Sequence, residues 1–161
     1  MKKIKLHNGE HTLIDDSDYK LVSKFNWYKQ SAGYVATCSR TTSKTKPVIL
    51  MHRLINNTPD GLFTDHINRN KLDNRRSNLR TVTRSQNKAN SPSYNKKKSS
   101  KFKGVYYEVH KNGDYKYWVA SIQKEGKQTR IGIFKNELSA AKAYNKKAKE
   151  LFGEFALLNN L

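Results

Sequence analysis

The sequence contains very little cysteine and no long apolar run, and each absence excludes a class of protein. Cys38 is the only cysteine among 161 residues, so an internal disulfide and a zinc site built from paired cysteines are both excluded. No apolar segment is long enough to span a bilayer, and the residues that follow Met1 do not resemble a signal peptide. We therefore expect a cytoplasmic protein that is neither secreted nor bound in a membrane.

Acidic residues are also scarce in this chain. It has 13 Asp and Glu against 32 Lys and Arg, which gives a net charge of +19 and an isoelectric point near 10.0. The basic residues are spread along the whole chain rather than confined to one tail. A membrane surface also attracts basic proteins, but a charge distributed in this way favours a nucleic-acid partner.

A change of composition divides the chain into two parts. Between residues 89 and 101, Ser, Asn, Pro and Lys dominate and apolar residues nearly vanish, which is typical of a linker. We expect one domain over residues 1–90, a basic linker over 91–100 and a second domain over 101–161. The run Lys96-Lys97-Lys98 either follows phosphates or serves as a flexible tether, and the sequence leaves both interpretations open.

The second part has clear signals of secondary structure. Strands are predicted over residues 104–109, 115–123 and 127–134, separated by turn signals at Lys111-Asn112-Gly113-Asp114 and Glu125-Gly126. Apolar residues then recur at helical spacing from Leu138 to Phe152, with Asn136 placed to cap the helix and Gly153 to end it. A three-stranded sheet with one helix on one face follows, and its other face is free to bind a partner.

The first part is expected to be rich in short strands. Trp27–Gln30 and Tyr34–Cys38 flank a Ser31-Ala32-Gly33 turn and predict a hairpin. Met51–Ile55 is too short for its pattern to distinguish a helix from a strand.

A spaced set of polar residues follows in the same part. Phe63–Ile67 predicts a strand, residues 68–74 a loop and Leu79–Val82 a second strand. Thr83 and Gln86 have capping-box spacing, so a helix that contains Asn87 should follow. The resulting ββα unit brings one histidine, His66, together with oxygen donors. A histidine titrates near neutral pH and can accept a proton from water, which makes it a candidate general base.

The residues of this unit resemble the HNH nuclease family, in its phage and intron-borne homing branch. The resemblance implies that Asp65 and Asn87 hold one divalent ion, that His66 is the general base, and that Asn78 ties the loop to the backbone and orients His66. The arginines of the same stretch are expected to contact DNA: Arg75, Arg76, Arg80 and Arg84. The resemblance is carried by Met51-His52-Arg53-Leu54, Asp65-His66-Ile67-Asn68, Leu72 to Arg80 and Ser85-Gln86-Asn87.

The chemistry of these residues bears on the metal and on the geometry. Carboxylate and amide oxygens are hard ligands, so Mg²⁺ or Mn²⁺ is expected in preference to Zn²⁺. Neighbours on a flat strand point to opposite faces, so Asp65 and His66 can share one site only if the strand twists or ends there. The alternative is a histidine in a hairpin with asparagines in turns. His52 either packs in the fold or contacts a phosphate, and the sequence leaves both interpretations open.

The second part resembles the Apetala2/ethylene-response DNA-binding domain. The resemblance is carried by Lys101 to Val105, Trp118-Val119-Ala120, Arg130 to Phe134, Ala140 to Ala148 and Phe152 to Asn159. In that family the sheet enters the major groove, which is wide enough for a β-ribbon. By position, the resemblance implies six groove-facing residues: Lys103, Tyr106, Ser121, Gln123, Gln128 and Arg130.

Together these features predict an α+β protein. Its N-terminal β-rich domain contains a ββα-metal (HNH) motif, and a small three-stranded antiparallel sheet packed on one helix follows. The expected function is a metal-dependent DNA endonuclease that nicks one strand at a targeted site in a bacterial host or phage-infected cell. The alternative is a non-catalytic, sequence-specific DNA-binding regulator. We expect double-stranded DNA as partner and no small-molecule cofactor; a monomer is favoured and a dimer stays open.

Overall fold

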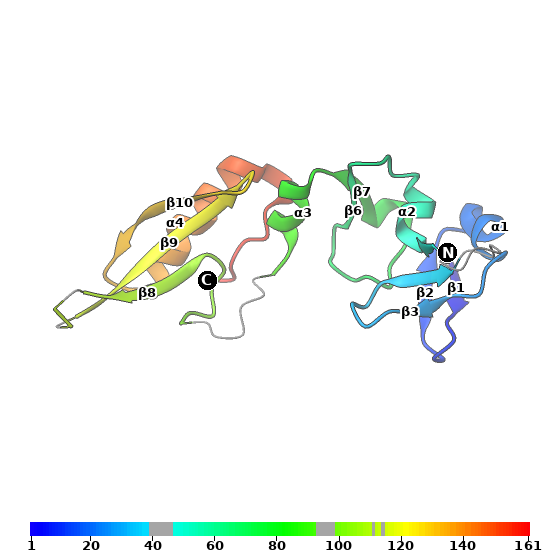
Figure 1. Ribbon diagram of the computed structural model, residues 1–161, viewed down its shortest axis with the longest axis horizontal. Helices are drawn as coiled ribbons and strands as arrows, with labels where there is room; N and C mark the ends of the chain where they lie inside the picture. Colours follow the sequence, from blue (N-terminus) through cyan, green and yellow to red (C-terminus); the bar gives the residue numbers. More distant parts are fainter. Residues whose placement is uncertain (39–46, 93–98, 111, 114) are drawn as a thin grey trace. The chain divides into compact units, whose positions relative to one another are not determined.

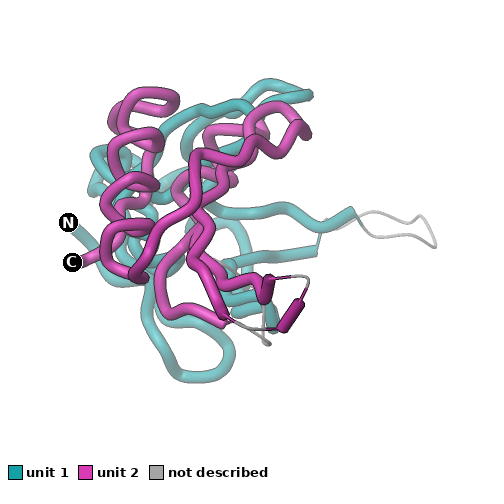
Figure 2. Tube along the Cα trace, turned by 90° about the vertical axis from the view of Figure 1, so that its left-hand side faces the viewer, with its two compact units in different colours: residues 1–83 teal, residues 84–161 magenta. Residues whose placement is uncertain are grey.

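The chain folds into two compact units, residues 1–83 and residues 84–161. A computed structural model describes residues 1–38, 47–92, 99–110, 112–113 and 115–161 (Figures 1 and 2). The boundary between the units falls before the one expected near residue 90, because the helix α3 (Arg84–Asn90) belongs to the second unit.

The first unit is built from short strands and helices. In the described part of this unit the strands form three small antiparallel sheets, of order β1-β2, β3-β4-β5 and β6-β7. In chain order the elements are β1 (Lys2–Lys5), β2 (His11–Ile14), η1 (Asp16–Asp18), α1 (Tyr19–Val22), β3 (Tyr28–Lys29), β4 (Val35–Cys38), β5 (Val48–Leu50), α2 (Met51–Asn56), β6 (Phe63–His66), η2 (Arg76–Asn78) and β7 (Leu79–Val82). The β3–β4 hairpin confirms the one predicted from the sequence, with Gly33 in its turn at a φ of 87°.

A single small apolar core holds these short elements together. Met51, His52 and Ile55 of α2 are all buried, and this spacing fits one side of a helix, whereas the neighbours Met51 and His52 would point to opposite faces of a strand. Trp27 is buried and its Nε1 donates to the Val22 carbonyl at 2.8 Å. The buried members of the core are Leu6, Ile14, Val22, Trp27, Val35, Met51, Ile55 and Leu79.

The second unit is a three-stranded antiparallel sheet covered on one face by a helix. Its elements are α3, β8 (Val105–Val109), β9 (Lys116–Lys124), β10 (Lys127–Phe134), α4 (Glu137–Phe152) and η3 (Gly153–Phe155), and the strand order is β8-β9-β10. Asn136 caps α4 through its Oδ1, which accepts from the Ser139 amide at 2.8 Å, and Gly153 ends the helix at a φ of 53°. Both helix signals read from the sequence are confirmed.

Small residues let α4 lie close to the sheet. Ala140, Ala141 and Ala148 are buried on the helix face that meets the strands. They pack in one core with Phe102, Val105, Ala120, Ile122, Tyr144 and Phe152. Because these residues come from all parts of the unit, the sheet and the helix stabilise each other.

The segment expected as a linker is partly structured. Ala89 is buried in the core of the second unit, so the end of α3 is not part of a flexible connection. Ser100 is also buried; its Oγ donates to Glu137 Oε1 at 2.6 Å and accepts from the Phe102 amide. Composition does not indicate these contacts, because they are tertiary contacts of single residues at the two ends of a polar stretch. Lys96, Lys97 and Lys98 lie outside the described residues.

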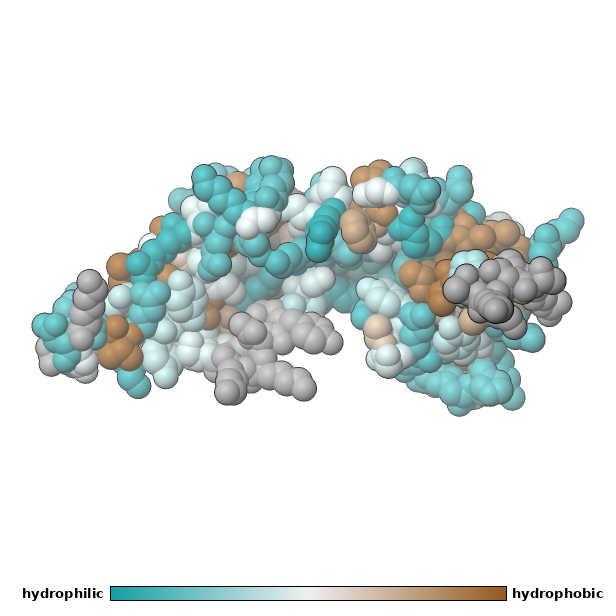
Figure 3. Space-filling view, viewed as in Figure 1, coloured by the Kyte–Doolittle hydropathy of each residue, from teal (hydrophilic) through white to brown (hydrophobic). Residues whose placement is uncertain are grey.

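Hydrophilic side chains dominate the visible surface of each unit (Figure 3). Within the described ranges, no helix combines the length and the apolar character needed to cross a membrane.

Gly104 is the residue on which the packing of α4 against the sheet depends most sharply. It has a φ of +73°, and a Cβ built on it would lie 2.1 Å from Tyr144 Cδ2 and 2.6 Å from the Ser121 carbonyl oxygen. We predict that Gly104→Ala lowers the free energy of unfolding of the second unit by about 3 kcal/mol or more, through strain and overpacking together.

Gly126→Ala is the matched control for that change. Gly126 has a similar φ of +82° and open space around the added Cβ, so only the backbone strain, about 1 kcal/mol, should remain. Chemical denaturation followed by circular dichroism measures both variants. Equal losses would show that the close approach to Tyr144 does not matter.

Candidate active site

The candidate site is built on the β6–β7 ladder of the first unit. The strands pair antiparallel, with Asp65 opposite Arg80 and His66 opposite Leu79. Asp65 and His66 end β6 and are only 7% and 4% exposed. Two ionisable side chains at this depth require polar partners, because a buried group without them is costly.

Asp65 has its partner directly across the ladder. The Arg80 guanidinium contacts Asp65 Oδ2 through Nε and Nη2, both at 2.9 Å. The two side chains are 13% and 8% exposed, so water screens this ion pair weakly. Arg80, expected as a DNA contact, therefore offsets the charge of the carboxylate expected to bind metal.

His66 has a different set of neighbours. Its Nε2 lies 3.2 Å from Asn74 Oδ1, and its ring packs edge-on against His52, with the ring centroids 5.1 Å apart. Burial lowers the pKa of His66 below its usual value, while the Asn74 contact and the charge of Asp65 oppose that shift. Burial therefore favours the neutral imidazole, which is the form that can accept a proton.

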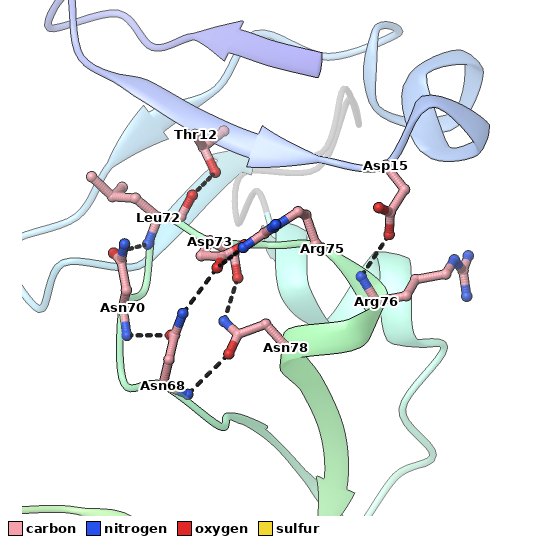
Figure 4. A network of polar contacts seen from close by, with 9 residues as sticks. All are labelled: Thr12, Asp15, Asn68, Asn70, Leu72, Asp73, Arg75, Arg76 and Asn78. Carbon is pink, nitrogen blue, oxygen red and sulfur yellow. Dashed lines mark hydrogen bonds and ion pairs between the residues drawn. The ribbon is translucent and has the colours of Figure 1, made fainter. Parts of the chain in front are cut away.

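The loop from Ile67 to Asn78 is closed by its own polar side chains (Figure 4). Asn78 Oδ1 accepts from the Asn68 amide at 2.9 Å, and Asn78 Nδ2 donates to the Asp73 carbonyl at 2.7 Å. Asn68 Nδ2 also donates to Asp73 Oδ2 at 2.9 Å. Asn78 thus ties the loop together, as the family resemblance implies, whereas the contact described on the His66 ring comes from Asn74.

Two further arginines brace this loop. Arg75 reaches both oxygens of Asp73 through Nε and Nη2 at 2.7 Å, and this contact lowers the pKa of Asp73. Arg76 Nη2 contacts Asp18 Oδ1 at 2.7 Å. The Arg76 backbone amide donates to Asp15 Oδ2 at 2.8 Å (Figure 4). Arg75 and Arg76 were expected on DNA, and in the structure each has an aspartate partner within its own unit. Arg84 is exposed at the start of α3.

Sequence reasoning did not assign Tyr34 and Lys71 to the site and left His52 open. Tyr34 packs against both histidine rings, at 5.0 Å from His52 and 6.2 Å from His66, and burial raises its pKa. Lys71 Nζ lies 4.2 Å from the centroid of the Tyr34 ring. His52 is 4% exposed, which favours packing over phosphate contact. In the sequence, the one sign that His52 belongs to the site is its place in the stretch Met51-His52-Arg53-Leu54.

The second expected metal ligand lies in the other unit. Asn87 is half-buried on α3, and its role together with Asp65 stays a prediction. Among the described residues, no three His, Cys, Asp or Glu side chains gather in a way that could hold a metal ion.

Comparisons with known proteins place the chain in a family. A family model described as HNH endonuclease matches residues 57–89. Over 153 residues the chain is 35% identical to the uncharacterized HNH endonuclease L560 of Acanthamoeba polyphaga mimivirus, an alignment that covers 95% of this chain and 76% of the relative. The chain belongs to the HNH endonuclease family. No solved structure matches it.

The family assignment favours the nuclease over a non-catalytic regulator. The matched residues of this HNH endonuclease contain the whole expected set, Asp65, His66, Asn78 and Asn87. HNH nucleases generally use a divalent metal ion. The match begins after β5 and α2, so the elements that pack behind the site lie outside it.

The second unit of the HNH endonuclease presents most of the expected DNA-contacting residues on one sheet face. Trp118, Ala120 and Ile122 of β9 pack toward α4, so the alternate residues of the strand face away from the helix. Cross-strand partners share a face, which places these residues together on the open side of the sheet, away from α4: Tyr106 opposite Val119, Arg130 opposite Ser121 and Gln128 opposite Gln123. Val119 and Ser121 are themselves buried by their neighbours.

Several of these side chains also have contacts within the unit. Arg130 Nη2 contacts Glu108 Oε2 at 2.5 Å, and Gln128 Nε2 donates to Ser121 Oγ at 3.2 Å. Gln123 Nε2 donates to the Gly126 carbonyl at 2.8 Å. Lys103 Nζ donates to the carbonyls of Lys88 and Ala89, where it caps the end of α3.

His52 makes the stability of the first unit depend on pH. Burial, together with the neighbouring His66 and nearby cations, lowers the pKa of His52 to about 3. In the unfolded chain a histidine has a pKa near 6.5, so the unfolded chain binds more protons than the folded one below that pH. The contribution of neutral His52 to the free energy of unfolding is therefore fully present above pH 6.5 and is lost as the pH falls toward 3. We predict a loss of about 2 kcal/mol between pH 6.5 and pH 5.

The control for this prediction is a histidine on the surface. In His52→Phe the loss should be clearly smaller, whereas His7→Gln, which changes an exposed residue, should keep the wild-type slope. Thermal or urea unfolding at a series of pH values gives the slope of the free energy of unfolding against pH for each variant. A His52→Phe slope equal to that of the wild type would contradict the assignment.

Proposed function

We propose that this HNH endonuclease hydrolyses a phosphodiester bond of double-stranded DNA with His66 as the general base. The observation that carries the proposal is the buried imidazole of His66, which Asn74 contacts at Nε2 and which directly follows Asp65 at the end of β6. Burial lowers the pKa of His66, which favours the neutral ring. His66 would take the proton of a water molecule as its oxygen attacks phosphorus. The P–O3′ bond then breaks, and the departing 3′ oxygen takes a proton from solvent, which leaves a 5′-phosphate and a 3′-hydroxyl.

The protein groups around His66 divide the remaining work. Asp65 and Asn87 would hold Mg²⁺ or Mn²⁺, which when bound supplies positive charge to the scissile phosphate. Arg80 keeps the Asp65 carboxylate in one orientation through two contacts at 2.9 Å. Asn78 and Asp73 keep the loop closed, so the backbone that follows His66 does not have to be ordered when the substrate binds.

The second unit would choose where the enzyme cuts. We infer an Apetala2-like role for its open sheet face, on which Tyr106, Gln128 and Arg130 lie away from α4. A β-ribbon fits the major groove, and glutamine and arginine are the side chains that read adenine and guanine edges there. With one active site per chain, a monomer would nick one strand, which fits a homing-type enzyme from a phage or a mobile intron.

His66→Ala tests the chemistry. We predict that the substitution lowers metal-dependent nicking of supercoiled plasmid by at least 10²-fold while the affinity for DNA changes little, because a general base acts only in the reaction step. His7→Ala, at an exposed position, is the control. Nicked circles should form with Mg²⁺ and disappear when a chelator is added. Cleavage by His66→Ala at the wild-type rate would refute the assignment of the base.

The open sheet face makes a separate prediction about binding. If about eight phosphates are neutralised, log Kd plotted against log salt concentration should have a slope of magnitude near 7. Arg130→Ala should weaken binding and lower that magnitude by up to about one. Lys142→Ala, on the exposed side of α4, should leave both unchanged. Fluorescence anisotropy gives the values, and equal effects of the two substitutions would argue against DNA binding by this face.

A further inference from the structure

We propose that Thr12 and Asn74 are positioning residues that fix the orientation and the protonated nitrogen of His66, so that the β1–β2 hairpin is part of the catalytic apparatus. The proposal rests on the proposed role of His66 as the general base. Asn74 lies within residues 57–89, which match the HNH family, whereas Thr12 and the rest of the β1–β2 hairpin lie outside them. The basis of the proposal is a chain of hydrogen bonds in which the direction of each bond follows from chemistry.

The direction of the hydrogen bonds in this chain is set first at Thr12. Its hydroxyl lies 2.8 Å from the backbone carbonyl of Leu72, which can only accept, so Thr12 Oγ1 donates its single proton there (Figure 4). The same oxygen lies 2.7 Å from Asn74 Nδ2 and must accept from it. Asn74 Nδ2 also lies 3.3 Å from the Lys71 carbonyl, a second acceptor.

These contacts fix the Asn74 amide. With its nitrogen facing two acceptors, its oxygen must be the atom that faces His66 Nε2 at 3.2 Å. An amide oxygen only accepts, so His66 Nε2 carries the proton and Nδ1 is the basic nitrogen of the neutral ring. The β2 hydroxyl therefore determines, through one amide, which nitrogen of the general base can take a proton.

Backbone hydrogen bonds join the same two segments as the side chains of Thr12 and Asn74, and they hold those side chains in place. The Leu13 amide donates to the Leu72 carbonyl and the Asn74 amide to the Leu13 carbonyl, both at 2.8 Å, and Leu13 and Asp73 form a parallel bridge. Thr12 and Asn74 are both fully buried. A buried amide without this partner would lose a hydrogen bond that water cannot replace, so Asn74 has one stable orientation.

The experiment compares two isosteric changes. Thr12→Val removes the hydroxyl, and Thr37→Val removes the hydroxyl of another buried threonine in the same unit, which serves as the control. Thr12→Ser restores the hydroxyl. Nitrogen-15 NMR of the histidine rings in the metal-free full chain, with the His66 signal assigned by its loss in His66→Ala, reports the tautomer directly. Cleavage under single-turnover conditions with Mg²⁺ and plasmid DNA gives the rate.

The wild type, Thr12→Ser and Thr37→Val should show the tautomer protonated at Nε2. Thr12→Val should show a mixture of tautomers and cleave roughly three- to tenfold more slowly, the effect of one lost hydrogen bond. A wild-type ring protonated at Nδ1 overturns the proposal whether or not any variant folds. A Thr12→Val ring that stays protonated only at Nε2, or a Thr37→Val enzyme that slows equally, also overturns it.

The two readouts separate this inference from the proposed function. The tautomer is measured without metal or substrate, so it stands or falls independently of catalysis. If His66→Ala still cleaves, His66 is not the base and the proposed function fails, whatever the tautomer is. If His66→Ala is inactive and the Thr12 hydroxyl has no influence on the ring, only the role of the hairpin is lost.

Discussion

The arrangement of the first unit depends on the need to satisfy one fully buried amide, that of Asn74. Its backbone and side chain together reach Leu13, Thr12, Lys71 and His66, and these partners come from three separate segments. Burying such a group without partners would cost several times the net value of the bonds it makes. The loop, the N-terminal hairpin and the end of β6 can therefore reach their native positions only together.

The parts of the fold predictable from sequence are those set by local signals. Asn136 and Gly153 delimit α4, the Ser31-Ala32-Gly33 turn produces the β3–β4 hairpin, and the strands β6 and β7 lie where alternation and turn residues indicate. Each of these signals acts within a few residues of the chain. The expectation for Asp65 and His66, that neighbours on a strand turn to different partners, also follows from local geometry alone.

Some of the contacts that hold the loop in place join residues far apart in the chain, which is why the sequence did not reveal them. Thr12 and Asn74 are separated by 62 positions, and Arg76 and Asp18 by 58. No periodicity or motif connects such pairs, and a buried threonine on a strand has the same sequence signature whether or not it bonds a catalytic loop. The burial of Ala89 was not predictable for the same reason, because it depends on Phe102 and on residues of α4.

The net charge of +19 combines two kinds of basic residue with different uses. Six of the eight arginines lie between residues 53 and 84. Arg75, Arg76 and Arg80 each form an ion pair with an aspartate, and Arg53 donates to the carbonyls of Leu62, Thr58 and Pro59 just before β6. The planar guanidinium suits such forked contacts, whereas the strongly hydrated lysine ammonium suits an exposed surface. Each Arg–Asp pair adds nothing to the net charge, so the excess that attracts DNA is carried mainly by lysines.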